Sequence, residues 1–439
     1  MIFKFGRKGG NQPAAEEVEV ELIRFQGATN GVSFDMQAHE KLVRIAFEPI
    51  KELLTDAVNR RAETLRVDPK GDRATIAFLV DGVPVPAGRI PRQRAHAMTQ
   101  MAKLLGGLDV SVRTEPQAGG VKASLEADEF EIEILTQPVA GGVERLTAHI
   151  RNLDEELDKP EDIGMTVDLK TKIREVTGHD QGVFLACGPP RSGVTTTLFA
   201  SIRGLDAYLR DIQTICDTGG RELVNISRFE TNAEDDLQES IRRCVRIEPN
   251  VILLDPIADA STAQMVAEFS DRVSFVSEIT AKDAANGVLQ WLEWIGDPAK
   301  GVESLSGTVS QKLIRRLCND CKEAYKPNPN LLRKIGLDPE EVSVLYRKAR
   351  PPADAIEKGE EMEPCYTCND SGYRGRVALF EIIEMNDEMK QLVGSGANAA
   401  AIQTKARESD MLTLQQDAMR HVADGTTSLE ELQRVFKAG

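Results

Sequence analysis

Residues 188–197 have the sequence GPPRSGVTTT and follow the apolar run GVFLACG. Gly188, Gly193 and Thr195 match three fixed positions of the motif G-x-x-x-x-G-K-[ST], in which backbone N–H groups bind nucleotide phosphates. The lysine position of that motif is Val194 here. The sequence therefore predicts a strand, a glycine turn and a helix that form an anion-binding loop without its usual charged side chain.

Apolar runs alternate with amphipathic stretches on both sides of this loop. The strand-like runs are GVFLACG, IQTICD, NVILLD and RVSFVSEI, and the intervening stretches with helical spacing begin near residues 195, 233 and 261. Apolar strands separated by amphipathic helices predict a mostly parallel sheet that is covered on both faces. We therefore expect an α/β core in this part of the chain.

The segments that flank this core differ from it in pattern. The first 34 residues contain Gly, Pro and Glu with weak periodicity, which is typical of a mobile leader. Helical spacing within AFEPIKELLTDAVNRRAETLRV and alternation within RATIAFLVDG and EFEIEILTQP predict a small α/β domain, and the polar LDKPEDIGM indicates a linker after it. The expected divisions are a flexible leader at 1–34, an α/β domain at 35–155, the core at 156–317, a cysteine-bearing segment at 318–376 and a helical part at 377–439.

Composition excludes several classes of protein. The chain has 439 residues and a formal net charge of −16, which argues against a nucleic-acid partner, because such proteins usually carry a basic face. No apolar run approaches the length that spans a bilayer, and the first residues lack the apolar segment of a secretory signal. We therefore expect a cytoplasmic protein.

Four of the seven cysteines form two C-x-x-C pairs, Cys318 with Cys321 and Cys365 with Cys368. In a long cytoplasmic chain, paired C-x-x-C motifs indicate a metal site rather than disulfides. Four thiolates fit a closed tetrahedral zinc site whose role is structural. The alternative, four buried apolar thiols, would not need this pairing.

Three C-terminal stretches resemble the type II secretion and type IV pilus assembly ATPases. They are QKLIRRLCNDCKEAY, PCYTCNDSGYRGR and DMLTLQQDAMRHVADGTTSLEELQRV, at residues 311–325, 364–376 and 410–435. The resemblance implies a RecA-like P-loop NTPase core, a PAS-like domain before it, and a tetracysteine zinc-binding insertion. It also implies a hexameric ring and a nucleotide site that would bind ATP and Mg²⁺. The residues expected to contact the nucleotide are Gly188, Ser192, Gly193, Val194, Thr195, Thr196 and Asp255.

Several catalytic positions of the family are altered in this sequence, so both of its Walker motifs are degenerate. Pro256 occupies the position of the catalytic glutamate, although Asp255 before it could still reach Mg²⁺ through water. Cys216 replaces one of two paired carboxylates, and Thr280 stands where the family has a histidine. The positions that match the family's N-terminal arginines are Ala77, Leu79, Thr114 and Gly120.

These losses remove charges that serve phosphoryl transfer, which is catalysed almost entirely by positioning and electrostatics. We therefore expect no catalytic residues and a non-hydrolysing component of a secretion or pilus machine. It would sit in a ring with an active relative or dock on the inner-membrane platform. Two alternatives stay open: an active motor in which Asp255 and Arg191 replace the missing groups, and a zinc-stabilised adaptor that binds no nucleotide.

Overall fold

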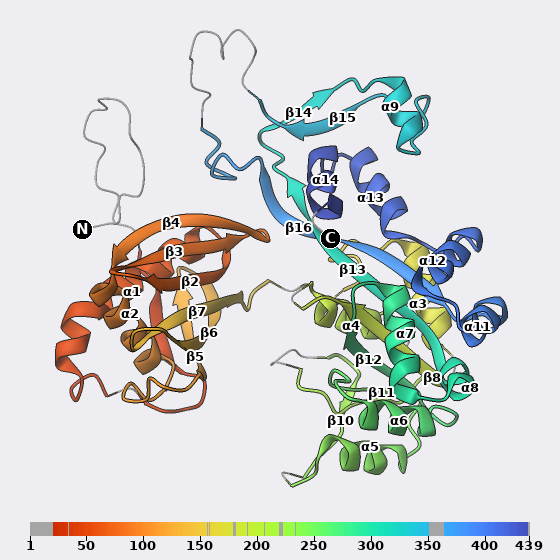
Figure 1. Ribbon diagram of the computed structural model, residues 1–439, viewed down its shortest axis with the longest axis horizontal. Coiled ribbons are helices and arrows are strands. Elements are labelled where there is room, and N and C mark those ends of the chain that lie inside the picture. The colour runs from red at the N-terminus through yellow and green to blue at the C-terminus, as the bar shows by residue number, and fades with distance from the viewer. Residues whose placement is uncertain are drawn as a thin grey trace. The chain divides into compact units, whose positions relative to one another are not determined.

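The computed structural model divides the chain into two compact units, Met1–Glu156 and Leu157–Gly439 (Figure 1). It describes residues 21–33, 35–155, 157, 159–178, 181–190, 192–205, 207–218, 223–232, 234–350 and 364–437. Residues 1–20 of the predicted leader and Arg191 therefore lie outside the described residues. Within the described part, no helix is long and apolar enough to cross a membrane.

The first unit is built on one antiparallel sheet with the strand order β1-β5-β6-β7-β2-β3-β4. Two helices pack against it, and the apolar residues of the helices and strands form a single core. In chain order the elements are β1 Arg24–Ala28, α1 Glu40–Asn59, β2 Ala62–Lys70, β3 Arg73–Val80, β4 Val83–Pro91, α2 Arg92–Leu105, β5 Gln117–Leu125, β6 Asp128–Val139 and β7 Val143–Asn152.

Two features of this unit differ from the sequence expectation. The stretch AFEPIKELLTDAVNRRAETLRV, which has helical spacing, is a helix in its first part and a strand in its last part. Helix α1 ends at Asn59, Arg61 takes a φ of 56°, and β2 begins at Ala62. The segment assigned to the leader contains strand β1, which pairs with β5, and the side chain of Ile23 is fully buried. Part of the segment before residue 34 therefore belongs to the folded unit.

The second unit contains a seven-stranded sheet with the order β10-β9-β11-β12-β8-β13-β16. Every neighbouring pair is parallel except β13 and β16, which are antiparallel. The α/β class with a parallel-rich sheet is thus confirmed. The strands are β8 Gly182–Gly188, β9 Ile212–Thr214, β10 Ser227–Arg228, β11 Val251–Leu253, β12 Ser274–Thr280, β13 Leu305–Leu317 and β16 Tyr373–Glu384.

Helices cover both faces of this sheet. Along β8, Val183, Leu185 and Cys187 face one apolar cluster while Phe184 and Ala186 face another, as the two-residue period of a strand requires. The first cluster includes residues of α5 Leu237–Val245, α6 Ala260–Phe269, α7 Ala284–Ile295, α8 Pro298–Ser304, α11 Asp387–Gly394 and α12 Ala399–Glu408. The second includes residues of α3 Val167–Thr177 and α4 Val194–Arg203.

The long strands β13 and β16 continue past the main sheet into a smaller apolar cluster. This cluster includes Ile314 of β13 and Leu379 of β16. The elements beside it are β14 Lys322–Tyr325, α9 Pro329–Lys334, β15 Leu345–Lys348, α13 Leu414–Ala423 and α14 Leu429–Lys437. This end of the sheet carries the cysteine pairs.

A buried carboxylate fastens α14 to β13. Glu431 is 1% exposed and accepts hydrogen bonds from the backbone N–H and guanidinium of Arg315, and from the guanidinium of Arg434. Burial by itself would raise the pKa of Glu431, but the hydrogen bonds from Arg434 and Arg315 outweigh it and lower the pKa to about 2. The charged form is therefore the one that the folded state stabilises.

We expect Glu431→Gln to flatten the acid limb of the stability curve. Because the folded pKa of Glu431 lies below the unfolded value of 4.5, its contribution is complete above that value and disappears as the pH falls towards 2. A shift of this size corresponds to about 3 kcal/mol. Urea unfolding between pH 5 and pH 2.5 measures the effect. Glu303→Gln, at an exposed position, is the control, and parallel curves for Glu431→Gln and the wild type would contradict the prediction.

Candidate functional site

The glycine turn at residues 188–193 joins β8 to α4 at the carboxyl edge of the parallel sheet. Gly193 has a φ of +85°, a conformation that side chains other than glycine rarely adopt, and it is the N-cap of α4. Gly188 is needed for a different reason, because a Cβ there would lie 2.4 Å from Ser192 Oγ and 2.7 Å from Val194 Cγ2. The turn is therefore tightly packed around these two glycines.

Val194, at the lysine position of the motif, faces the protein interior. Its side chain is 9% exposed and belongs to the apolar cluster that includes Phe184, Ala186 and Leu198. A side chain in this cluster supplies packing rather than charge. A core residue thus stands at the lysine position of the motif, and only its backbone is free of this packing role.

Two neighbouring polar groups make the turn suitable for an anion. Ser192 is 9% exposed as a residue. Its Oγ atom is buried and has no hydrogen-bond partner among the described residues. The first N–H groups of an α-helix lack intrahelical partners, and Gly193 has no side chain that could cap α4. A phosphate oxygen is the kind of ligand that satisfies such donors.

Gln311 of β13 fixes the shape of the turn. Its Nε2 donates to the carbonyl oxygen of Ser192 at 2.5 Å, and its Oε1 accepts from Thr197 Oγ1. Gln311 is 2% exposed, so water competes little for these bonds. One buried side chain thereby connects the turn to the first full turn of α4.

Thr195, the expected magnesium-binding hydroxyl, contacts a carboxylate that the sequence reasoning did not single out. Its Oγ1 donates to both carboxylate oxygens of Glu278, at 2.9 Å and 3.1 Å. Glu278 lies near the end of β12, which runs parallel to β8 and pairs Thr280 with Gly188. The position of Glu278 near the end of a strand-like run could have indicated this contact, because the carboxyl ends of neighbouring parallel strands share one edge of the sheet.

Asp255, the other expected metal contact, faces the neighbouring strand β9. Its Oδ1 accepts the backbone N–H of Asp217 at 2.9 Å, just past the end of β9. Among the described residues, neither aspartate belongs to a group of three or more metal-ligating side chains. Asp259 caps α6 by accepting a hydrogen bond from the backbone N–H of Thr262.

The remaining altered positions lie in both units of the chain. Thr280 ends β12, and Pro256 follows Asp255 in an exposed loop. Cys216 is buried, and burial raises the pKa of its thiol, which disfavours the reactive thiolate. The positions matched to arginines lie in the first unit, with Ala77 and Leu79 on β3, Thr114 before β5 and Gly120 on β5.

The four cysteines of the two C-x-x-C pairs meet at one point, and their sulfur atoms all lie within 4.8 Å of one another. The distance between Sγ atoms is 3.9 Å for Cys318 and Cys365 and 3.6 Å for Cys321 and Cys368. Disulfide sulfurs would be about 2.05 Å apart, whereas tetrahedral Zn–S bonds of about 2.3 Å place sulfurs about 3.8 Å apart. The cluster can therefore bind a metal ion.

The turns that carry the cysteines are held in place by hydrogen bonds. The N–H of Gly372 donates to Cys368 Sγ at 3.3 Å, and the N–H of Cys365 donates to Asp370 Oδ1 at 2.7 Å. Thr367 Oγ1 donates to Asp320 Oδ2 at 2.5 Å and links the two pairs. Hydrogen bonds of this kind around the ligands orient a metal site.

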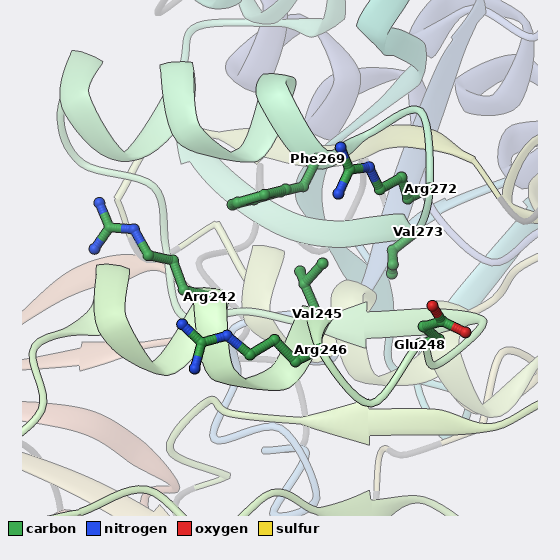
Figure 2. Close-up of a pocket in the computed structure, with 7 residues that line it drawn as sticks. All are labelled: Arg242, Val245, Arg246, Glu248, Phe269, Arg272 and Val273. Carbon is green, nitrogen blue, oxygen red and sulfur yellow. The ribbon is translucent and has the colours of Figure 1, made fainter.

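A pocket of about 640 Å³ lies elsewhere in the second unit, between the ends of α5 and α6 (Figure 2). It adjoins the starts of β11 and β12, which is the edge of the sheet opposite to the glycine turn. Basic side chains at helix C-termini interact favourably with the helix dipole. This structural role accounts for much of the basic lining of the pocket. The lining residues are Arg242, Val245, Arg246, Glu248, Phe269, Arg272 and Val273.

Comparisons with known proteins match most of the chain. The type IV pilus assembly ATPase PilB of Thermus thermophilus is 27% identical over 386 residues, which is 87% of this chain and 42% of that protein. The type II secretion system protein HxcR of Pseudomonas aeruginosa is 27% identical over 429 residues, 96% of this chain and 84% of that protein. The chain thus spans less than half the length of the first relative and most of the second.

A solved structure shares the fold. The ATPase DotB of Legionella pneumophila superposes with a TM-score of 0.58 at 13% identity, covering 90% of this chain and 96% of that one. At this identity the likeness establishes the architecture alone. The model of the type II/IV secretion system protein family matches residues 40–434. Since this match covers most of the sequence, the chain belongs to the type II/IV secretion system protein family.

Proposed function

We propose that this chain is a nucleotide-binding component of a type II secretion or type IV pilus machine that does not hydrolyse ATP. The observation that supports it most directly is the environment of residue 194. The turn keeps Gly193, the uncapped start of α4 and the orphaned Ser192 hydroxyl, whereas Val194 is part of the core. The groups that bind phosphate through the backbone are retained, and the charge that assists its transfer is not.

The residues of the turn would hold the nucleotide as follows. Backbone N–H groups at the start of α4 and the hydroxyl of Ser192 would donate to phosphate oxygens. The hydroxyl of Thr195 would contact Mg²⁺, which neutralises phosphate charge when it is bound. Removing one well-placed electrostatic stabiliser typically costs about 10² to 10³ in rate. The combined loss at Val194, Pro256 and Thr280 therefore supports binding without useful turnover.

We also propose that the cysteine cluster binds one zinc ion in a structural role. Its four thiolates complete a tetrahedral set, so no open position is left for a substrate or water. The domain limits predicted from the sequence are part of the same proposal, with residues 156–317 as the nucleotide-binding core and residues 318–376 as the zinc-binding segment. The metal would brace the far end of β13 and β16.

The relatives suggest where such a component would act. We propose that it works in the cytoplasm, at the inner membrane, within a hexameric ring that it forms with itself or with an active relative. The names of the matched proteins, a pilus assembly ATPase and a secretion system protein, support this setting. Assembly or regulation of the machine would then be its contribution.

A second candidate function, ATP hydrolysis by displaced residues, is favoured by one observation. Glu278 places a carboxylate on the hydroxyl of Thr195, a contact that the family motifs do not include. A carboxylate at this position can help to bind a cation. Hydrolysis also requires a general base within reach of the attacking water. The two functions therefore differ in turnover rather than in binding.

The test is equilibrium binding of a fluorescent ATP analogue together with steady-state phosphate release. We expect saturable binding to the purified chain and phosphate release at background, both alone and mixed with inactive carrier protein. Gly193→Ala is the loop control and should abolish binding, because its Cβ would lie 2.6 Å from Gln311 Nε2 and the φ is unfavourable. Turnover above background would contradict the proposal, and absence of binding would favour the adaptor.

A further inference from the structure

Helices α5 and α6 are joined near their first turns and leave a pocket between their last turns. Gln238 Nε2 donates to Ser261 Oγ at 2.8 Å and connects the starts of the two helices. The pocket at their other ends has a volume of about 640 Å³ (Figure 2). Binding sites for small molecules have volumes of about 300 to 1,000 Å³. The space is therefore large enough for a small ligand.

Part of the pocket lining is apolar. Val245 of α5 and Val273, which follows α6, are both buried. The ring of Phe269 is partly exposed and, in Figure 2, extends from α6 into the space between the two helices. A planar or apolar part of a ligand would bury surface against these three side chains.

Three exposed arginines give the pocket its charge. Arg242 lies in the last turn of α5, Arg246 is the C-cap of the same helix, and Arg272 follows α6. One carboxylate, that of Glu248, lines the pocket with them. The pocket therefore has an excess of positive charge on a chain whose formal net charge is −16. Guanidinium groups suit phosphate oxygens, which they bind through paired hydrogen bonds.

The helix dipole explains why basic residues lie at the end of α5, but it does not explain how differently they are partnered. Arg243 lies outside the pocket lining, forms an ion pair with Asp235, and has its Cζ 5.5 Å from the ring centroid of Phe229. Arg246 lines the pocket, and among the described residues its side chain has no hydrogen bond or ion pair. The donors of Arg246 are therefore available to a ligand.

The other two arginines of the pocket have weak partners. Arg242 contacts Glu239 at 3.4 Å and Arg272 contacts Asp271 at 3.7 Å, and all four side chains are exposed. Exposed ion pairs of this kind contribute little to stability, so a ligand can replace them at low cost. The Cζ atom of Arg272 also lies 6.0 Å from the ring centroid of Phe269. A cationic group and an aromatic ring are thus adjacent in the pocket.

We propose that this pocket binds a small molecule that carries a phosphate group beside a planar or apolar group. The three arginines bind the phosphate, and Phe269 contacts the remainder of the ligand. Glu248 repels the phosphate and thereby limits the affinity. The pocket adjoins the edge of the sheet opposite to the glycine turn, so this site is separate from the proposed nucleotide site and does not depend on it.

Phosphorus NMR titrations of the full chain with inorganic phosphate and with phenyl phosphate, at low ionic strength, test the site. We expect saturable binding of both probes, with phenyl phosphate at least about 5-fold tighter because its ring buries apolar surface. Arg246→Gln and Arg272→Gln should each weaken the binding of phenyl phosphate at least about 5-fold. Glu248→Gln removes a like charge and should tighten it.

Arg407→Gln is the matched control. It removes an exposed arginine from the last turn of α12, and therefore the same kind of interaction with a helix dipole, but Arg407 does not line the pocket. Its affinity for phenyl phosphate should equal that of the wild type. Thermal unfolding checks that each variant is folded. Equal weakening in all three arginine variants would show unspecific attraction and overturn the inference.

Gly193→Ala separates this site from the glycine turn. Binding of phenyl phosphate that persists in Gly193→Ala and weakens in Arg246→Gln supports the pocket, whatever the outcome for the turn. Binding that is lost in Gly193→Ala and unchanged in Arg246→Gln would place the probe at the turn, so the inference would fail while the proposed function stands. Absence of binding of either probe to the wild type would also overturn the inference.

Discussion

Cys318→Ser is expected to lower the free energy of unfolding of the second unit by more than about 5 kcal/mol. Structural zinc contributes about 10 to 16 kcal/mol of apparent binding free energy in small zinc domains, and loss of one thiolate forfeits much of it. Cys318 is 1% exposed and follows β13 directly, so the damage reaches the ladder between β13 and β16. The intact protein should contain about one zinc ion per chain by elemental analysis.

The measurement is urea unfolding of the full chain with and without a chelator, followed by tryptophan fluorescence. Trp291 and Trp294 both lie on α7, so this signal reports the second unit. Cys244→Ser is the matched control, because Cys244 is fully buried and lies outside the cluster. It should lose only about 1 to 3 kcal/mol, the cost of burying a hydroxyl, and should not respond to the chelator. Equal losses in the two variants would contradict a structural metal.

The second large effect is expected in the first unit, where Glu144→Leu should cost about 3 to 5 kcal/mol. Lys103 of α2 and Glu144 of β7 are both fully buried, with 2.9 Å between Nζ and Oε1. Gln100 Nε2 donates to the other oxygen of Glu144 at 2.6 Å, and Lys103 also donates to the carbonyl of Val112. Removing the carboxylate leaves a buried ammonium without its counter-charge, which is what makes such a change costly.

Adding Lys103→Met to Glu144→Leu should restore most of the lost stability, because two apolar side chains can replace a buried ion pair at little cost. Hydrogen exchange of amides in α2 and β7 measures the effect, since both tryptophans lie in the other unit. Asp56→Asn breaks the partly exposed pair with Arg60 and is the control, with an expected loss below about 1 kcal/mol. A double variant no more stable than Glu144→Leu would show that packing, and not charge, dominates.

The sequence predicted those elements whose pattern is local. Strands β8, β11 and β12 are short apolar runs between amphipathic helices, so their type and their parallel direction could be predicted. Strand β4 was missed because it contains Pro84, Pro86 and Pro91, which disfavour strands. Strand β4 is at the edge of its sheet, so one of its sides has no neighbouring strand. Prolines, which lack an N–H, are tolerated on that side. Strand β1 is the opposite edge, and only its pairing with β5 identifies it.

The candidate site was predictable as a set of positions and not as a set of contacts. Spacing placed Gly188, Gly193 and Thr195 on one turn, and the structure places the four cysteines within reach of one ion. The contact between Thr195 and Glu278 joins residues 83 positions apart, and its geometry depends on the register between β8 and β12. Motif comparison directs attention to Thr280 instead, because the family resemblance implies a histidine at that position.

Strand β13 connects the glycine turn to the cluster of four cysteines. Gln311 on this strand holds the glycine turn, and the same strand ends beside the first cysteine, Cys318. The ladder with β16 covers most of the backbone between these two residues, with one irregularity between Arg315 and Leu317. A displacement of the glycine turn would therefore be transmitted along β13 to the cysteine cluster, and the proposed zinc ion would hold that end of the strand in place.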